Sequence, residues 1–406
     1  MERIIAIRRG ANHREFAPAR MQHAIALEAY DTQRESTETM LMKRGLFPQE
    51  HYASLFQFDN MDGFSVALDS EHDVLELKAE LGDSHFIFHD VEMVLPTGLD
   101  GGSKKGSCTG EKWAAQTGVP KARNAGITGK NVVIGVLDTG IDMRHREFKG
   151  RNISCVFVPE DDLEDLRMMK RNGDKGKNGH GTSVCSIAAG SHMGVAPGAD
   201  LLVASVIESS TMKTSLFRVL RGITWFLGKV TQIQYSDFAY VLNLSFGFPE
   251  DSLKKLGQEI EDLEDGLEEL LKVYDVLVAA AIGNSGPGKM HAPGLFEEVL
   301  GVGACTHGLD PRTSSGGGQV ARTGLIKPDL CGLGVDICSA IPGSTGDQYQ
   351  RKSGTSMACP YVSGIAALIA QQTGLKGDDL RDELYSRLLK LNHPADRVGA
   401  GFARFG

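Results

Sequence analysis

Three short segments of this 406-residue chain each place one residue capable of acid–base or nucleophilic chemistry beside glycine. Asp138 ends the run V-V-I-G-V-L-D, His180 lies in N-G-H-G-T-S, and Ser356 lies in S-G-T-S-M-A-C-P. An aspartate that orients an imidazole, a histidine that moves a proton and a serine that attacks a carbonyl together perform acyl transfer. Each motif alone is a common turn or loop, so it is their conjunction that predicts this chemistry.

A fourth segment offers a donor for the negative charge that develops during acyl transfer. The apolar run 276–281 leads into I-G-N-S-G-P, which contains Asn284. A side-chain amide held at a glycine turn can donate to an oxyanion. The competing interpretation is a turn asparagine without a catalytic role, which is common beside glycine.

The elements around these residues are of the kind that position an active site. Residues 132–137 form a continuous apolar run, typical of a parallel strand buried on both faces, and Asp138 follows at its C-terminal end, where open α/β sheets keep their sites. The apolar spacing after His180 predicts a helix that begins near the imidazole. Ser356 precedes another apolar helical stretch, so its hydroxyl is expected at a helix N-terminus, where backbone donors favour negative charge.

These motifs resemble those of the subtilisin (S8) family of serine proteases, in which the triad residues follow the order Asp, His, Ser. The resemblance runs from about residue 112 to the C-terminus and includes H-G-T-S-V, G-V-A-P-G-A-D-L, N-L-S-F-G, K-P-D-L and G-T-S-M-A-C-P. It implies a serine endopeptidase in which Asp138 orients His180, His180 acts as general base and then acid, and Ser356 forms an acyl-enzyme. Asn284 and the Ser356 backbone N–H would form the oxyanion hole.

The resemblance also implies where a peptide or protein substrate binds. Family members pair the peptide as an added strand, here along the backbone of Ser245, Phe246 and Gly247 on one side and residues 208–211 on the other. Counting back from Ala292-Pro293 places His291 near the base of the first specificity pocket. A surface histidine in a loop is the alternative, and we assign no cleavage preference.

No metal and no cofactor are expected. Only the short connection 188–193 separates the His180 helix from G-V-A-P-G-A-D-L, where secreted relatives resemble one another in a longer calcium-binding loop. The acidic residues at 161, 162, 164 and 165 are interpreted as a solvated loop, with weak cation binding as the alternative. Residues 316–318 are a glycine loop without the Lys-Ser or Lys-Thr pair of a phosphate cradle.

The strand and helix signals of the first hundred residues predict a separate small α+β domain. Their order, β-α-β-β-α-β, is that of the ferredoxin-like arrangement. The expected elements are strands at 4–7, 52–58, 63–68 and 85–95 and helices at 16–46 and 71–81. The stretch 56–95 resembles the inhibitory prodomain (I9) of subtilisins. That resemblance implies an intramolecular inhibitor, and a permanent regulatory or substrate-recruiting domain is the alternative.

The domain boundaries follow from composition: an N-terminal domain at 1–96, a Gly-, Ser- and Lys-rich linker at 97–111, and a catalytic domain at 112–406. Strand and helix signals alternate through the last of these. We therefore expect an α/β fold, a subtilisin-like mostly parallel sheet with helices on both faces, after the small ferredoxin-like domain. The second function class left open is a regulatory or peptide-binding protein that keeps the fold and is held inactive by its N-terminal domain.

Composition narrows the partners and the compartment. A net charge of −9 with interspersed Lys and Arg argues against nucleic acid, and no apolar run is long enough to span a membrane. The seven scattered cysteines are interpreted as free thiols of a reduced compartment. The first residues show no signal h-region, which predicts a cytoplasmic location and leaves unconventional export open.

Overall fold

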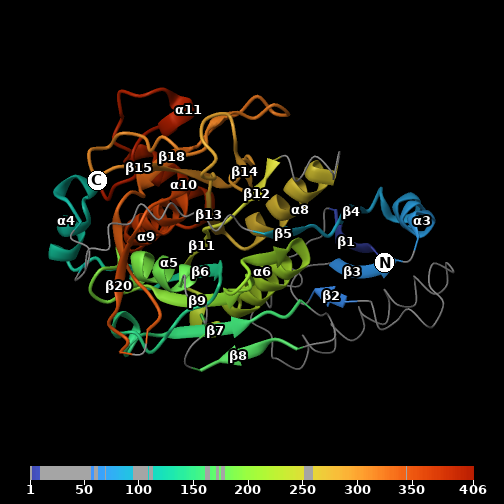
Figure 1. Ribbon diagram of the computed structural model, residues 1–406, viewed down its shortest axis with the longest axis horizontal. Helices are drawn as coiled ribbons and strands as arrows, with labels where there is room; N and C mark the ends of the chain where they lie inside the picture. The colour runs from blue at the N-terminus through green and yellow to red at the C-terminus, as the bar shows by residue number, and fades with distance from the viewer. Residues whose placement is uncertain are drawn as a thin grey trace.

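The computed structural model describes residues 2–9, 56–58, 63–68, 70–94, 108, 113–160, 165–170, 173–174, 179–250, 259–343 and 345–406. At its centre lies an eight-stranded sheet of order β18-β15-β13-β11-β6-β9-β7-β8 (Figure 1). Every neighbouring pair is parallel except β7 and β8. The strands are β6 (Val132–Asp138), β7 (Ile153–Phe157), β8 (Arg167–Met169), β9 (Asp200–Ser205), β11 (Ala239–Leu244), β13 (Val276–Ala281), β15 (Leu300–Cys305) and β18 (Leu330–Leu333).

Helices cover both faces of this sheet, as predicted. The pleat sends Val132, Ile134 and Val136 of β6 into a core with α5 (His180–Ala189) and α9 (Thr355–Thr373). Val133 and Leu137 point the other way, into a core with α6 (Leu216–Val230) and α8 (Glu259–Val273). The smaller helices and strand pairs are α4 (Val119–Asn124), α10 (Gly377–Ser386), α11 (Ala395–Val398), β12 (Phe248–Pro249) with β14 (His291–Ala292), β16 (Gly318–Gln319) with β17 (Ile326–Lys327), and β19 (Ile337–Ala340) with β20 (Tyr349–Lys352).

The N-terminal residues form a second, antiparallel sheet of order β2-β3-β1-β4. Its elements are β1 (Glu2–Arg8), β2 (Phe56–Phe58), β3 (Gly63–Leu68), α3 (Glu71–Leu81) and β4 (His85–His89). The strands lie where the ferredoxin-like prediction placed them, although β2 covers only the last part of 52–58. The predicted helix at 16–46 lies outside the described residues.

The two faces of this sheet bury against different partners because successive side chains of a strand alternate. Ile4 and Ala6 of β1 pack with the buried side of α3. Ile5 and Ile7, together with aromatic residues of β4, join the core that α6 and α8 share with the central sheet. The N-terminal sheet therefore extends the hydrophobic core of the larger unit, as Figure 1 shows by the position of β1 and β4 beside α8.

The last predicted strand, 85–95, is two strands. After β4 the chain turns at Asp90, whose carboxylate accepts the Phe217 N–H at 2.8 Å in the first turn of α6. Burial raises the pKa of Asp90, while this hydrogen bond and Arg3 lower it. The following strand β5 (Glu92–Val94) leaves the N-terminal sheet and pairs antiparallel with β10 (Lys213–Ser215). A carboxylate at a helix N-terminus thus redirects the chain toward the larger unit.

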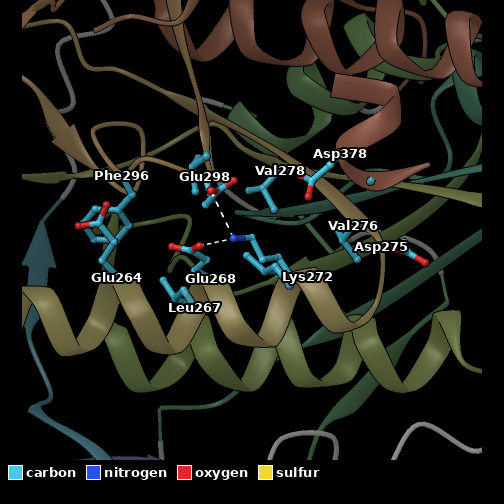
Figure 2. Close-up of a pocket in the computed structure, with 13 residues that line it drawn as sticks. Glu264, Leu267, Glu268, Lys272, Asp275, Val276, Val278, Phe296, Glu298 and Asp378 are labelled. Atoms are coloured by element: carbon cyan, nitrogen blue, oxygen red, sulfur yellow. Dashed lines mark hydrogen bonds and ion pairs between the residues drawn. The ribbon is translucent and has the colours of Figure 1, made fainter. Parts of the chain in front are cut away.

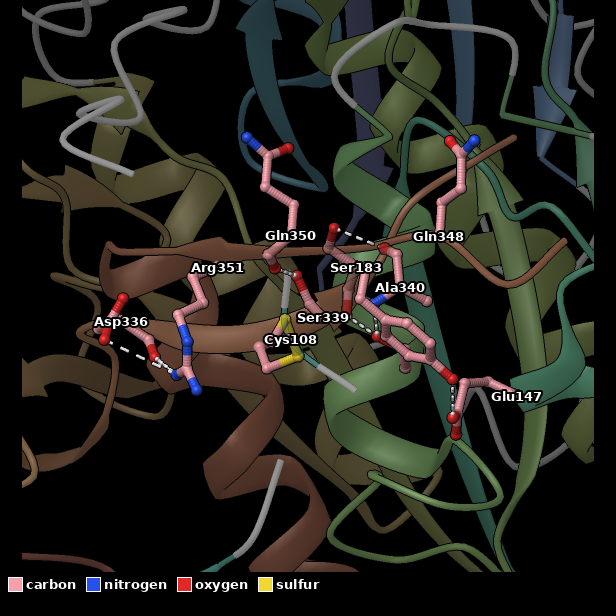
Figure 3. Close-up of a disulfide and its surroundings, with 12 residues drawn as sticks. Cys108, Glu147, Ser183, Asp336, Ser339, Ala340, Gln348, Gln350 and Arg351 are labelled. Atoms are coloured by element: carbon pink, nitrogen blue, oxygen red, sulfur yellow. Dashed lines mark hydrogen bonds and ion pairs between the residues drawn. A yellow bond between two sulfur atoms is a disulfide. The ribbon is translucent and has the colours of Figure 1, made fainter. Parts of the chain in front are cut away.

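The prediction of seven free thiols is wrong. Cys108 and Cys338 form a disulfide across 230 residues of sequence, which attaches the predicted linker to β19 (Figure 3). The other five cysteines are free and buried. Only the fold brings the two sulfurs together, because their spacing in sequence carries no pairing information. Disulfides persist in oxidising compartments, so the cysteines do not support a reduced one.

Candidate active site

Asp138 and His180 lie together at the carboxyl end of the central sheet. Asp138 is the last residue of β6, His180 the first of α5, and both side chains are buried. The imidazole Nδ1 lies 2.8 and 2.9 Å from the two carboxylate oxygens. The Thr139 backbone N–H also donates to Oδ1, at 2.7 Å. These contacts fix the ring orientation and leave Nε2 as the nitrogen that can exchange a proton with a substrate or nucleophile.

The glycines on either side of His180 permit this approach. Gly179, at the helix N-cap, has a φ of 56°, and a Cβ there would lie 2.0 Å from Pro342 Cδ. A Cβ on Gly181 would lie 2.1 Å from the Gly140 carbonyl oxygen. Both positions therefore exclude a side chain, one by conformation as well as by contact and the other by contact alone.

Ser356 is the second residue of α9 and is almost completely buried. The preceding residue, Thr355, donates its backbone N–H to the Asn284 side-chain oxygen at 3.0 Å. Asn284 follows β13, so this bond joins the turn after that strand to the N-terminus of α9. It brings Asn284 next to the residue that precedes Ser356.

Arg312 also contacts the Asn284 side chain. It lies in a polar loop of the sequence and was not predicted to belong to the site. Its guanidinium donates to the same Asn284 oxygen at 2.9 Å. Because both partners of that oxygen are donors, the amide orientation is determined, and the NH₂ group points away from them. Asn284 is partly exposed, and its two N–H donors are not used by the two contacts at its oxygen.

Two further charged side chains lie buried near the predicted triad residues, and the sequence motifs did not indicate them. Asp174, six residues before His180, is completely buried, and burial raises its pKa to about 6. Lys352, four residues before Ser356, is 7% exposed, and burial lowers its pKa to about 8. The carboxylates of Asp174 and Asp138 oppose that lowering. The sequence signal that could have indicated each of them is a charged residue a few positions before His180 or Ser356.

The residues predicted to bind substrate lie around the same end of the sheet. Ser245, Phe246 and Gly247 follow β11 and belong to no strand. A Cβ on Gly247 would lie 2.7 Å from His291 Cβ, and one on Gly283 would lie 2.7 Å from the His291 ring. The buried imidazole of His291 therefore sits between the segment 245–247 and the turn that carries Asn284. Burial lowers its pKa, which favours the neutral ring.

The other predicted binding segment, 208–211, forms a turn, since the Met212 N–H donates to the Glu208 carbonyl at 2.7 Å. The strand that follows it is β10, whose edge is paired by β5 of the N-terminal unit.

The short connection after α5 is held by a buried carboxylate. Glu147 lies in a 3-10 helix, Arg146–Phe148, and accepts the backbone N–H groups of His192 at 2.8 Å and Met193 at 3.2 Å. Its other oxygen accepts the Tyr349 hydroxyl at 2.6 Å. Among the described residues no group of three His, Cys, Asp or Glu side chains is arranged to hold a metal ion. The residues 161–164 of the acidic loop lie outside the described part of the chain.

A separate pocket lies between α8 and the loop after β14 (Figure 2). Three of its glutamates are paired, since Lys272 donates to Glu268 and, at 3.3 Å, to Glu298. Glu264 likewise accepts from Arg322. The lining contains none of the residues around Asp138, His180 and Ser356, so this pocket is not part of the site.

Comparison with known proteins places the chain among serine proteases. Residues 129–401 match the model of the subtilase family, peptidase S8. The chain is 37% identical over 357 residues to the subtilisin-like protease PopC of Myxococcus xanthus, covering 82% of this chain and 73% of PopC. It is 29% identical over 299 residues to the major intracellular serine protease of Bacillus subtilis, covering 70% and 84%. The prenylagaramide maturation protease PagA superposes with a TM-score of 0.55 at 26% identity, covering 71% of this chain and 96% of that one.

The chain belongs to the subtilase family of serine proteases. It is a subtilisin-like serine endopeptidase, and its substrates are peptides or proteins. None of the helices in the described residues is both long and apolar enough to cross a membrane.

Proposed function

We propose that Asp138, His180 and Ser356 are the catalytic triad and that Asn284 is the side-chain donor of the oxyanion hole. The observation that carries the proposal is the contact of both Asp138 oxygens with His180 Nδ1, which leaves Nε2 to serve as the base. The bond from Thr355 N–H to the Asn284 side-chain oxygen supports the second part, since Thr355 directly precedes Ser356.

In this mechanism His180 Nε2 takes the proton of the Ser356 hydroxyl as Oγ bonds to the scissile carbonyl carbon. The carbonyl oxygen becomes an oxyanion, which accepts hydrogen bonds from the Asn284 NH₂ and a backbone N–H at the start of α9. The imidazolium, held by Asp138, then gives its proton to the leaving amine as the peptide C–N bond breaks. Water attacks the acyl-enzyme by the same steps and releases the acid.

We also propose that residues 1–96 act as an intramolecular inhibitor, so that the protease is made as a self-inhibited precursor. Two contacts support this. The strand β5 covers the edge of β10, so the N-terminal unit ends as an added strand, in the manner in which peptides bind to exposed sheet edges. The sheet behind it packs on α6 and α8 as a continuous core.

Charged contacts at α8 strengthen the same interface. The Glu259 carboxylate accepts the His89 backbone N–H at 2.9 Å and contacts His89 Nδ1 at 2.8 Å and the Lys78 ammonium. Burial raises the pKa of Glu259, but the hydrogen bonds from His89 and Lys78 outweigh it and hold the pKa below its ordinary value. The interface is therefore matched in charge as well as in apolar surface, which a tight inhibitor requires.

Wild-type protein is expected to cut itself once between residues 95 and 112, whereas Ser356→Ala stays full-length, because a docked strand holds the following bonds near the nucleophile. Intact mass spectrometry, run with and without reductant, locates the cleavage site. The disulfide makes the two conditions informative: a cut before Cys108 frees the N-terminal fragment, and a cut after it leaves the fragments joined until reduction. Fully active, uncut wild-type protein would favour a permanent regulatory domain.

We further propose that Ser245, Phe246 and Gly247 pair with substrate and that His291 forms the floor of the pocket for the side chain before the scissile bond. His291 lies against Gly283, which directly precedes Asn284, and its ring is buried. Such a floor shortens the pocket, so His291→Gly should raise kcat/KM for bulky side chains relative to alanine by about tenfold or more. A panel of peptides varied at that position measures the ratio, and an unchanged ratio would remove His291 from the pocket.

A cytoplasmic location stays a prediction. Relatives of this chain include intracellular proteases, which agrees with it. The Cys108–Cys338 disulfide favours an oxidising environment instead.

A further inference from the structure

A carboxylate outside the triad links the two segments that carry Asp138 and His180. Asp174 Oδ2 accepts the Thr182 hydroxyl at 2.7 Å and the Thr182 backbone N–H at 3.1 Å, in the first turn of α5. Its Oδ1 accepts the Thr139 hydroxyl at 3.2 Å, one residue after Asp138. Thr139 Oγ1 in turn accepts the Gly181 N–H at 2.9 Å. Asp174 thus connects the residue after Asp138 to the first turn of the helix that begins with His180.

This arrangement places two carboxylates, Asp174 and Asp138, in one buried site. Burial and the neighbouring charge of Asp138 both raise the pKa of Asp174. A protease needs the carboxylate beside its imidazole to be charged, since that charge stabilises the imidazolium. The site therefore requires a compensating cation.

Lys352 supplies the cation from the third triad segment. It is the last residue of β20, the strand that leads into α9, and its ammonium donates at 3.4 Å to the carbonyl of Gly179, the residue before His180. Among the described residues, the ionisable groups that act on its pKa are Asp174 and Asp138. Burial lowers its pKa only to about 8, so it is charged at neutral pH.

We propose that Lys352 is a positioning residue of this protease: its buried ammonium holds the carbonyl that precedes His180 and provides a positive charge that offsets the two buried carboxylates, Asp138 and Asp174. The proposal rests on the triad assigned above. Asp174 bridges the end of β6 and α5 through Thr139 and Thr182, and Lys352 connects β20 to the residue before α5.

The consequence is a specific pH dependence. Loss of the Lys352 charge favours the protonated form of a carboxylate and of the imidazole alike, because a nearby cation disfavours both protonated forms. The acid limb of kcat/KM, which reports the free enzyme, then moves to higher pH. Removing Asp174 as well removes one of the two carboxylates, so the acid limb moves back toward its wild-type position.

The test is the pH profile of kcat/KM for wild type, Lys352→Met, Asp174→Asn and the double variant. We expect the acid limb of Lys352→Met to lie about one pH unit above that of wild type, and that of the double variant to lie within about 0.3 units of the wild-type acid limb.

The matched control is Lys327→Met. Lys327 is equally buried and pairs with Asp329 at 2.6 Å, but its partners Phe296, Val299 and Asp329 belong to none of the triad segments. That variant should lose thermal stability and keep the acid limb.

A folded Lys352→Met enzyme with an unchanged acid limb would overturn the proposal, as would a double variant that is shifted as far as the single one. If Lys352→Met fails to fold, Asp174→Asn decides alone: its acid limb should lie at or below that of wild type, and an acid limb above wild type contradicts the proposal. These outcomes differ from failure of the triad itself, which would appear as activity in Ser356→Ala.

Discussion

Replacing Ser356 with alanine is expected to abolish peptide hydrolysis and covalent labelling by a fluorophosphonate. The substitution removes the oxygen that attacks the substrate and the group that the reagent labels. The expected loss of kcat is about ten-thousandfold or more, the order found when one triad member is removed from subtilisin. Triad members act as a unit, so the remaining two do not sustain the reaction.

The fold should survive this change. Ser356 lies in the first turn of α9, and alanine is the residue best accommodated in a helix. Circular dichroism and the thermal midpoint of the variant provide the control, and hydrolysis of a peptide substrate provides the measurement. Activity above a few per cent of wild type in a folded, uncontaminated Ser356→Ala preparation would rule out Ser356 as the nucleophile.

Asn284→Ala is expected to lower kcat by about a hundredfold to a thousandfold with little change in KM, again the range found for the equivalent donor of subtilisin. The amide meets the oxyanion only in the transition state, so its removal should affect turnover rather than binding. Its oxygen is held by Arg312 and the Thr355 N–H, and the NH₂ group is therefore already oriented before substrate arrives.

Asn284→Asp separates this role from a purely structural one. An aspartate keeps an acceptor for Arg312 and Thr355 but presents no donor and adds negative charge where the oxyanion forms. It should therefore be at least as defective in kcat as the alanine variant while retaining the thermal midpoint. Steady-state kinetics of both variants on one substrate provide the comparison. Normal turnover with a raised KM in either variant would make Asn284 a substrate-positioning residue instead.

The local sequence was sufficient to predict the fold of the larger unit. Buried parallel strands are continuous apolar runs, and β6 and β13 match the predicted ranges closely because nothing outside the strand is needed to define such a run. The glycines beside His180 and Asn284 marked the turns at strand and helix ends. Those motifs also supplied the four residues proposed for the site, and their order indicated the family that the comparison then showed.

Partnerships between distant segments could not be read in the same way. The disulfide joins residues 230 apart, and the break of the last N-terminal strand at Asp90 depends on a helix that begins 126 residues later, at Leu216. The sequence analysis did not single out Lys352 or Arg312, because a charged side chain is usually solvated unless the fold buries it.

What the sequence determined by itself, then, is the type of chemistry, since residue identity and local backbone geometry suffice to name a nucleophile, a base and a donor. What the tertiary structure decided is the environment of that chemistry: the cation beside two carboxylates, the donors that orient Asn284, and the β5–β10 pairing at the edge of the catalytic unit. Burial and charge compensation depend on which segments pack together, and this packing exists only in the folded chain.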